Sequence, residues 1–344
     1  MRNYALGGIR SKTRTRTKTR RTTSTLKKLS KGIHPQSNNR KQIYNKILHS
    51  KHDTYRMKYD KIVKLSCSPT ARKKHKKQYS CLSDDILYKL KNMWNERHPD
   101  AQIHSKNPEE IWKMLKQNMS NVCNKESCWL KQDFTKGQMN HLVKDEFAPE
   151  SPNEWKKNPN EWLSSVDIIN VMKQYENAYK CFNFMGPSPI DYDTRKVDGE
   201  CVWNELCNFN LKQEMRRGIY KIGIIFNLDP HYKSGSHWVS LFIDIKKGKI
   251  FFFDSAGDKV PKQIKKLSDN IIEQGKQLHP PIQFNFDENH PKEHQFGDTE
   301  CGIYSLFFII HMLEDKIDGN YLKKNMLNDK FMEKFRQVYF NPDL

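Results

Sequence analysis

Residues 295–302 read QFGDTECG, and an apolar run, IYSLFFII, follows directly at residues 303–310. This junction predicts a loop that leads into a buried helix beginning near Cys301. Unpaired backbone N–H groups and the helix dipole at such a start favour a thiolate over a thiol. Cys301 is therefore a candidate nucleophile, although a packing cysteine that merely begins a core helix would show the same local pattern.

A hairpin predicted upstream supplies candidate partners for this thiol. The run VSLFIDI at residues 239–245 predicts a strand that begins just after His237, and IFFF at residues 250–253 predicts a second strand that ends at Asp254. An antiparallel hairpin returns the end of its second strand to the start of its first. We therefore expect His237 and Asp254 at the same end of the sheet, although a strand cap and a turn residue would fit the same positions.

The order of these motifs is typical of a known family. His-Trp at a strand start, Phe-Asp-Ser at the end of the next strand and Gln-x5-Cys-Gly before an apolar helix resemble the adenain and SUMO-protease superfamily of cysteine peptidases. The segment NEWLSSVDII at residues 160–169 resembles the Trp-Leu-x-x-x-x-Ile helix that opens the catalytic domain in this superfamily. The resemblance covers residues 155–344 and is strongest to the maturation proteases of large DNA viruses.

Position by position, the resemblance implies Cys301 as the nucleophile, His237 as its general base and Asp254 as the residue that orients the imidazole. Gln295 and the backbone N–H of Cys301 would form the oxyanion hole. Losing one such donor commonly lowers turnover by about 100- to 1,000-fold. Gly302 would let the backbone pack closely behind the nucleophile. Taken alone, Gln295 is also consistent with an ordinary loop amide.

Trp238 and Trp162 bear on the substrate. In the superfamily the corresponding tryptophans line a narrow cleft that admits only small residues before the scissile bond. The resemblance therefore implies cleavage at Gly-Gly-x or Gly-x-Gly sites, because a side chain would clash with the indoles. The alternative is that both tryptophans belong to the core.

Rival residues exist for both chemical roles. His290 and His294 lie close to Cys301 in the sequence, but loop histidines usually face solvent, and neither marks a strand edge. Cys201 and Cys207 are rival nucleophiles without the following glycine, and we expect them to be packing cysteines.

The expected fold is α+β, a papain-like or adenain-like cysteine protease with a mixed sheet flanked by helices at residues 151–344. Residues 220–227 and 281–286 predict further strands. A small helical domain at residues 79–150 should precede it, with helices capped by Ser83 and Asn107.

Residues 1–78 are expected to form a basic, largely disordered tail. Residues 1–80 carry 24 Lys and Arg against two Asp, whereas the whole chain has a net charge of +20. The arm at residues 10–31 alternates basic residues with Thr and Ser and has little to bury. It predicts non-specific contact with nucleic acid through counterion release, with a targeting signal or a solubilising tail as alternatives. The basic cluster at residues 72–77 repeats the pattern and is a candidate nuclear-localisation signal.

Eight cysteines without a signal peptide indicate a reducing compartment, so we expect no disulfide framework. Cys123 and Cys128 have the spacing of half a zinc site, but no second pair follows, and we expect neither a metal nor another cofactor. No apolar run approaches 18 residues, so no membrane association is expected. The expected locations are the virion and the host cytoplasm with its viral factories, or the nucleus.

Three functions are open at this stage. The first is a cysteine endopeptidase that cleaves viral capsid or core precursors. The second is an isopeptidase that removes SUMO or ubiquitin-like modifiers from conjugates. The third is an inactive, nucleic-acid-binding virion protein, which the complete set of four catalytic candidates argues against.

Overall fold

The computed structural model describes residues 66–75, 77 and 79–342 of the 344-residue chain. The polybasic arm at residues 10–31 and its predicted nucleic-acid contact lie outside these residues. In the described part of the chain, no helix combines the length and the apolarity needed to span a membrane.

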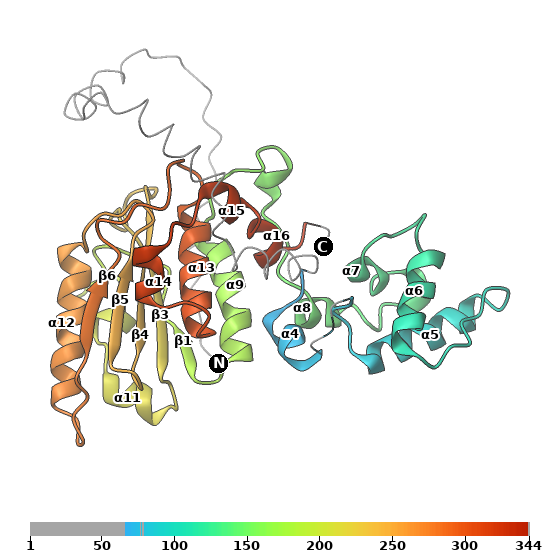
Figure 1. Ribbon diagram of the computed structural model, residues 1–344, viewed down its shortest axis with the longest axis horizontal. Helices are drawn as coiled ribbons and strands as arrows, with labels where there is room; N and C mark the ends of the chain where they lie inside the picture. The colour runs from blue at the N-terminus through green and yellow to red at the C-terminus, as the bar shows by residue number, and fades with distance from the viewer. Residues whose placement is uncertain (1–65, 76, 78, 343–344) are drawn as a thin grey trace, which may run out of the picture. The chain divides into compact units, whose positions relative to one another are not determined.

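A six-stranded mixed sheet organises the C-terminal part of the chain (Figure 1). Its order is β1-β3-β4-β5-β6. The short strand β2 also pairs with β3, at Phe226 and Asn227, whereas β1 pairs with the start of β3. The strands β3, β4 and β5 are antiparallel neighbours, whereas β1 and β2 run parallel to β3 and β6 runs parallel to β5. The bounds are β1 Phe182–Phe184, β2 Ser188–Pro189, β3 Lys221–Asn227, β4 Trp238–Asp244, β5 Lys249–Phe253 and β6 Asn285–Glu288. The predicted α+β class with a mixed sheet is confirmed.

Helices cover both faces of this sheet (Figure 1). The helices of this part are α9 Ser165–Ala178, α10 Asn204–Cys207, α11 Leu211–Arg216, α12 Lys262–Lys276, α13 Cys301–Leu313, α14 Gly319–Lys324, α15 Asp329–Glu333 and α16 Arg336–Tyr339. The strand β5 shows how the faces are divided. Phe251 and Phe253 belong to the core that contains α9 and α13, and Ile250 and Phe252 belong to the core that contains α12. Burial on both faces explains why the strands are nearly continuous hydrophobic runs rather than alternating ones.

The helix α13 lies at the centre of the larger core. Twelve of its 13 residues are buried. The sheet covers one side, and the rings of Phe331 and Phe335 from the C-terminal segment pack against Phe307, with the Phe307–Phe335 centroids 4.8 Å apart. A helix enclosed on all sides needs no polar stripe, which accounts for the unbroken apolar run in the sequence.

Two predicted elements begin later than expected. The helix α9 starts at Ser165, because Ser164 and Asp167 form a capping box there, so Trp162 precedes the helix instead of lying in it. The strand predicted at residues 281–286 starts only at Asn285, because the N–H of Ile282 donates to Gly275 O of α12 at 2.9 Å and not to β5.

The upstream helical domain has a core of its own. Its helices are α5 Asp84–Arg97, α6 Pro108–Asn118, α7 Glu126–Trp129, the 3-10 turn η2 Asp133–Thr135 and α8 Leu142–Glu146. The predicted caps are present. Ser83 Oγ accepts the N–H of Ile86, and Asn107 Oδ1 accepts the N–H groups of Glu109 and Glu110.

The prediction that the disordered tail extends to residue 78 is wrong for residues 66–75. This segment carries the helix α4 Pro69–His75, and Ala71 is buried. Two of its basic side chains form hydrogen bonds with α9. The Arg72 guanidinium donates to Tyr175 Oη at 3.1 Å, and Lys73 Nζ donates to Ala178 O at 2.6 Å. Basic side chains with fixed partners of this kind serve the fold, which weakens the case for a freely accessible localisation signal at residues 72–77.

Six of the eight cysteines are paired in disulfides, contrary to the prediction. The pairs are Cys67–Cys81, Cys123–Cys128 and Cys201–Cys207. The expectation rested on the redox compartment, whereas the fold brings these side chains together through short chain separations of 14, 5 and 6 residues. Cys181 and Cys301 are the two free cysteines in the described residues.

Two histidines are buried within the part of the chain that contains the sheet. His294 is fully buried, and its Nδ1 accepts the N–H of Leu327 at 3.2 Å. Burial and the nearby Lys292 charge lower the pKa of His294 to about 3. Burial likewise holds the pKa of His311 well below its usual value. The expectation that His294 faces solvent, as loop histidines usually do, is therefore wrong.

This burial predicts a specific loss of stability in acid. The unfolded chain binds a proton at His294 below pH 6.5, but the folded chain does so only near pH 3, so the free energy of unfolding falls as the pH falls through this window. The contribution is about 1.4 kcal/mol per pH unit. His294→Asn keeps an acceptor for Leu327 and does not titrate, so urea unfolding across this window should show a shallower pH dependence. The exposed control His141→Asn should keep the wild-type slope, and equal slopes for all three proteins would contradict the prediction.

Candidate active site

His237 and Asp254 meet at one end of the sheet. His237 immediately precedes β4 and Asp254 immediately follows β5, and the register pairs Ser240 with Phe253. The imidazole Nε2 lies 2.7 Å from Asp254 Oδ1, with the carboxylate side chain only 3% exposed. The expectation that the hairpin brings these two residues together is confirmed.

Cys301 completes the cluster from the first residue of α13. Cys301 is 2% exposed, and the interaction of its side chain with the His237 imidazole raises the pKa of that ring. Because Nε2 of the ring contacts Asp254, Nδ1 is the nitrogen that remains for the sulfur. The structure thus places a thiol, an imidazole and a carboxylate in one line of contacts.

The electrostatics of His237 fit this arrangement. Burial opposes charge on the ring, but the hydrogen bonds and negative charges of Asp254 and Cys301 outweigh it and raise the pKa of His237 to about 10. The imidazole is therefore protonated at neutral pH. A cation beside a cysteine sulfur is the general condition that favours reactivity of the sulfur as a nucleophile.

Asp254 is held by Asn289, which the sequence did not single out. The N–H of Asp254 donates to Asn289 Oδ1 at 2.9 Å, and Asn289 Nδ2 donates to Asp254 O at 2.7 Å and to Lys292 O at 2.8 Å. Asn289 is 1% exposed. An asparagine just after a predicted strand is too common in sequences to mark such a role.

Gln295 is anchored to the residue that follows Asp254. Its Oε1 accepts the hydroxyl hydrogen of Ser255 at 2.7 Å, which fixes which end of the amide carries the donors. Its Nε2 donates one of its two hydrogens to Gly297 O at 2.9 Å. The second amide hydrogen remains available to another acceptor. The backbone N–H of Gln295 also donates to Ser255 O at 2.9 Å.

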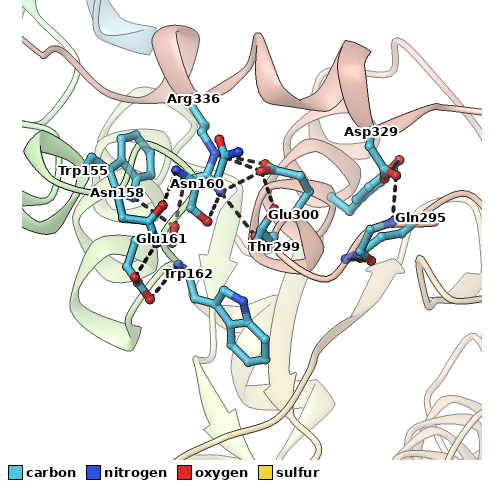
Figure 2. A network of polar contacts seen from close by, with 12 residues as sticks. Trp155, Asn158, Asn160, Glu161, Trp162, Gln295, Thr299, Glu300, Asp329 and Arg336 are labelled. Carbon is cyan, nitrogen blue, oxygen red and sulfur yellow. Dashed lines mark hydrogen bonds and ion pairs between the residues drawn. The ribbon is translucent and has the colours of Figure 1, made fainter.

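Asp329 holds the loop between Gln295 and Cys301 (Figure 2). Its Oδ2 accepts the backbone N–H groups of Phe296 at 3.0 Å and Gly297 at 2.9 Å, and its Oδ1 accepts the Tyr304 hydroxyl at 3.0 Å. No feature of the sequence near Asp329 predicted this contact, because the two partners are backbone groups more than 30 residues away.

The two tryptophans line one cleft of about 870 Å³ but differ in burial. Trp238 is 8% exposed, and its Nε1 donates to Leu163 O at 3.1 Å. Trp162 is 39% exposed, so it is not a core residue. Trp238 combines both expectations, since it packs in the core and also lines the cleft.

The rival residues have other partners. His290 Nδ1 contacts Gly257 O at 2.8 Å, and His294 contacts Leu327. Cys201 and Cys207 are bonded to each other.

Comparison with known protein families agrees with this geometry. The model of the Ulp1 protease family, C-terminal catalytic domain, matches residues 217–343, which hold His237, Asp254, Gln295 and Cys301. Residues 217–343 are therefore similar to the catalytic domain of that family. The protein is a cysteine-type peptidase, and the resemblance seen in the sequence motifs is confirmed.

The relatives found by sequence comparison are viral proteins. The chain is 29% identical over 299 residues to a protein of Acanthamoeba polyphaga mimivirus named as a thiol protease, covering 80% of this chain and 92% of that one. It is 25% identical over 256 residues to a cysteine protease of African swine fever virus, covering 70% of this chain and 91% of that one. The crystal structure of an African swine fever virus protease matches with a TM-score of 0.57 at 20% identity, covering 80% of this chain and 95% of that one. The likeness in fold therefore extends upstream of residue 217.

The raised pKa of His237 predicts a measurable titration. A nearby carboxylate favours the charged imidazole, so Asp254→Asn should move the titration of the His237 ring from about 10 toward 6.5. Nuclear magnetic resonance of isotope-labelled histidine measures it, with the His237→Gln spectrum to assign the signal. A wild-type ring that titrates near 6.5 would contradict the raised pKa of His237.

Gly302 has a steric role that predicts another effect. A Cβ at this position would lie 3.0 Å from Cβ and 3.1 Å from Cδ1 of Leu163, the residue whose carbonyl holds the Trp238 indole. Gly302→Ala should displace both and lower kcat/KM by roughly 10- to 100-fold. The double variant Gly302→Ala with Leu163→Ala restores the space and should recover part of the loss. A single variant with wild-type kinetics would show that the helix start is free to shift.

Proposed function

We propose that this protein is a cysteine endopeptidase that cleaves viral structural or polyprotein precursors at Gly-Gly-x or Gly-x-Gly sites. The observation that carries the proposal is the Cys301–His237–Asp254 line of contacts beside the cleft that contains Trp162 and Trp238. The similarity of residues 217–343 to a peptidase family supports the reaction class, and the viral relatives support the class of substrate.

In the proposed mechanism, the Cys301 thiolate attacks the scissile carbonyl carbon and a tetrahedral oxyanion forms. The free hydrogen of Gln295 Nε2 and the N–H of Cys301 stabilise that oxyanion. The His237 imidazolium then protonates the leaving amine as the C–N bond breaks, which leaves a thioester acyl-enzyme. Neutral His237 next removes a proton from water, the resulting hydroxide attacks the thioester, and the thiolate departs with the imidazolium restored.

The supporting residues suit this cycle. Asp254 holds the ring by Nε2 and so keeps the other nitrogen toward the sulfur in both protonation states. Ser255 keeps the Gln295 amide oriented with its donors outward. The helix start beneath Cys301 adds a positive dipole end to the site.

The preference for glycine follows from the cleft. Trp238 is fixed by its bond to Leu163 O, so it cannot move aside for a substrate side chain. Trp162 presents an exposed indole to the same cleft. A substrate segment without Cβ atoms fits between such walls at the lowest cost.

A second candidate function is an isopeptidase that releases SUMO or ubiquitin-like modifiers. One African swine fever virus relative, 25% identical over 256 residues, is named as a SUMO-1 cysteine protease. A modifier that ends in Gly-Gly would use the same cleft.

We further propose that the enzyme acts in the virion and in cytoplasmic viral factories, and that the basic residues upstream of residue 66 contact nucleic acid non-specifically.

Cleavage assays separate these functions. The full chain should cleave a peptide with Gly-Gly-x and leave the matched Ala-Ala-x peptide intact, and Cys301→Ala should abolish the cleavage. Trp162→Ala widens the cleft and should allow some cleavage of the Ala-Ala-x peptide. Mass spectrometry of the products measures peptide cleavage by the wild type, Cys301→Ala and Trp162→Ala. Candidate virion precursors and SUMO or ubiquitin conjugates are tested as substrates in parallel. Efficient release of intact modifier without cleavage of precursors would favour the isopeptidase.

A further inference from the structure

The guanidinium of Arg336 is buried against Thr299 and Glu300, the two residues that precede Cys301 in the chain (Figure 2). Arg336 is 6% exposed and Glu300, the residue immediately before Cys301, is 2% exposed. Arg336 Nε donates to Glu300 Oε1 at 3.1 Å and Oε2 at 3.0 Å, and Nη2 donates to Oε1 at 2.8 Å. Nη2 also lies 3.2 Å from Thr299 O. This side chain therefore holds the last two residues of the loop that precedes Cys301.

The same guanidinium reaches the segment that carries Trp162 (Figure 2). Arg336 Nη1 donates to Glu161 O at 2.8 Å, and Nη2 lies 3.4 Å from Asn160 O. Trp155 closes the contact, with its ring 4.5 Å from the guanidinium carbon and its Nε1 donating to Glu161 O at 3.0 Å. One planar group thus bridges two chain segments about 140 residues apart, one leading to the nucleophile and the other to the cleft wall.

The chemistry of this site calls for arginine. A buried carboxylate next to a thiolate opposes the negative charge on sulfur unless a cation neutralises it. Lysine would supply the charge, but only arginine has a planar fork that donates in several directions at once. Removing one partner of a buried ion pair leaves an uncompensated charge, which is far more costly than the net worth of the pair.

We propose that Arg336 is a positioning residue for the peptidase reaction. It neutralises Glu300 beside Cys301 and fixes the start of α13 against the segment that carries Trp162. The proposal rests on the proposed roles of Cys301 and Trp162. It assigns Arg336 two separable effects, one on the reactivity of the thiol and one on the binding of the substrate.

Thiol alkylation tests the first effect without any substrate. Iodoacetamide labelling of the full chain, followed by peptide mass spectrometry, gives separate rates for Cys301 and for Cys181, the other free thiol of the described residues. Arg336→Met should slow labelling of Cys301 by about tenfold or more, since the Glu300 charge then opposes the thiolate. Cys181 should keep its rate, whereas general loosening of the fold would speed it. Glu300→Gln combined with Arg336→Met removes the stray charge and should recover much of the Cys301 rate.

Kinetics with a cleaved peptide test the second effect. Arg336→Met should lower kcat and raise KM, and the double variant should recover kcat while KM stays high, because the carbonyls of Asn160 and Glu161 still lack their donor. Arg336→Lys keeps the charge but not the fork, so it should raise KM and change Cys301 labelling little. This variant keeps the proposal testable if Arg336→Met does not fold.

The matched control is Arg217→Met, which breaks the ion pair between Arg217 Nη1 and Glu214 Oε1 at 2.6 Å. It should change neither readout. Wild-type labelling of Cys301 together with wild-type KM in folded Arg336→Met, or in Arg336→Lys if the former does not fold, would overturn the proposal. If wild type cleaves no Gly-containing peptide, the proposed substrate class fails, while the labelling rates still decide whether Arg336 controls the thiol.

Discussion

The burial of α13 on every side is the constraint on which the rest of the structure depends. Cys301 is the first residue of this helix, and twelve of the 13 helix residues are packed against the sheet or against the C-terminal helices. A helix enclosed in this way cannot slide or rotate without opening cavities in its surroundings. The position of the sulfur is therefore set by the core, and Gly302 marks how closely the helix start approaches Leu163.

The chemically active groups converge on that fixed sulfur, and each is held by a buried neighbour that does not itself react. Asn289 grips the backbone of Asp254, and Ser255 orients the Gln295 amide. Because Ser255 directly follows Asp254, one strand end holds both the proposed orienting carboxylate and the proposed oxyanion donor. Pre-organisation of this kind spares the enzyme the cost of reorienting dipoles during the reaction.

The sequence predicted the parts of the site that depend on local order along the chain. Two strand-like apolar runs joined by a turn were enough to place His237 near Asp254, and an apolar run after a Cys-Gly pair was enough to place Cys301 at a helix start. Asn289 and Arg336 could not be predicted in the same way, because their partners are mostly backbone groups 35 to 176 residues distant. The helix at residues 69–75 was not predicted, because the segment is strongly basic and buries only Pro69 and Ala71. So few apolar residues give no recognisable helical pattern in the sequence.

Charge balance explains why these long-range contacts accompany the local motif. Asp254 contacts the His237 ring, and Glu300 directly precedes Cys301 in the chain. An unpaired anion at either position would oppose the thiolate that the proposed mechanism requires. Asp254 is matched by the His237 cation and Glu300 by Arg336. Replacing such pairs by apolar groups is often neutral for stability, so stability alone does not account for them. Their value here is local, since each removes a negative charge from the surroundings of the sulfur while fixing a segment that the reaction needs in place.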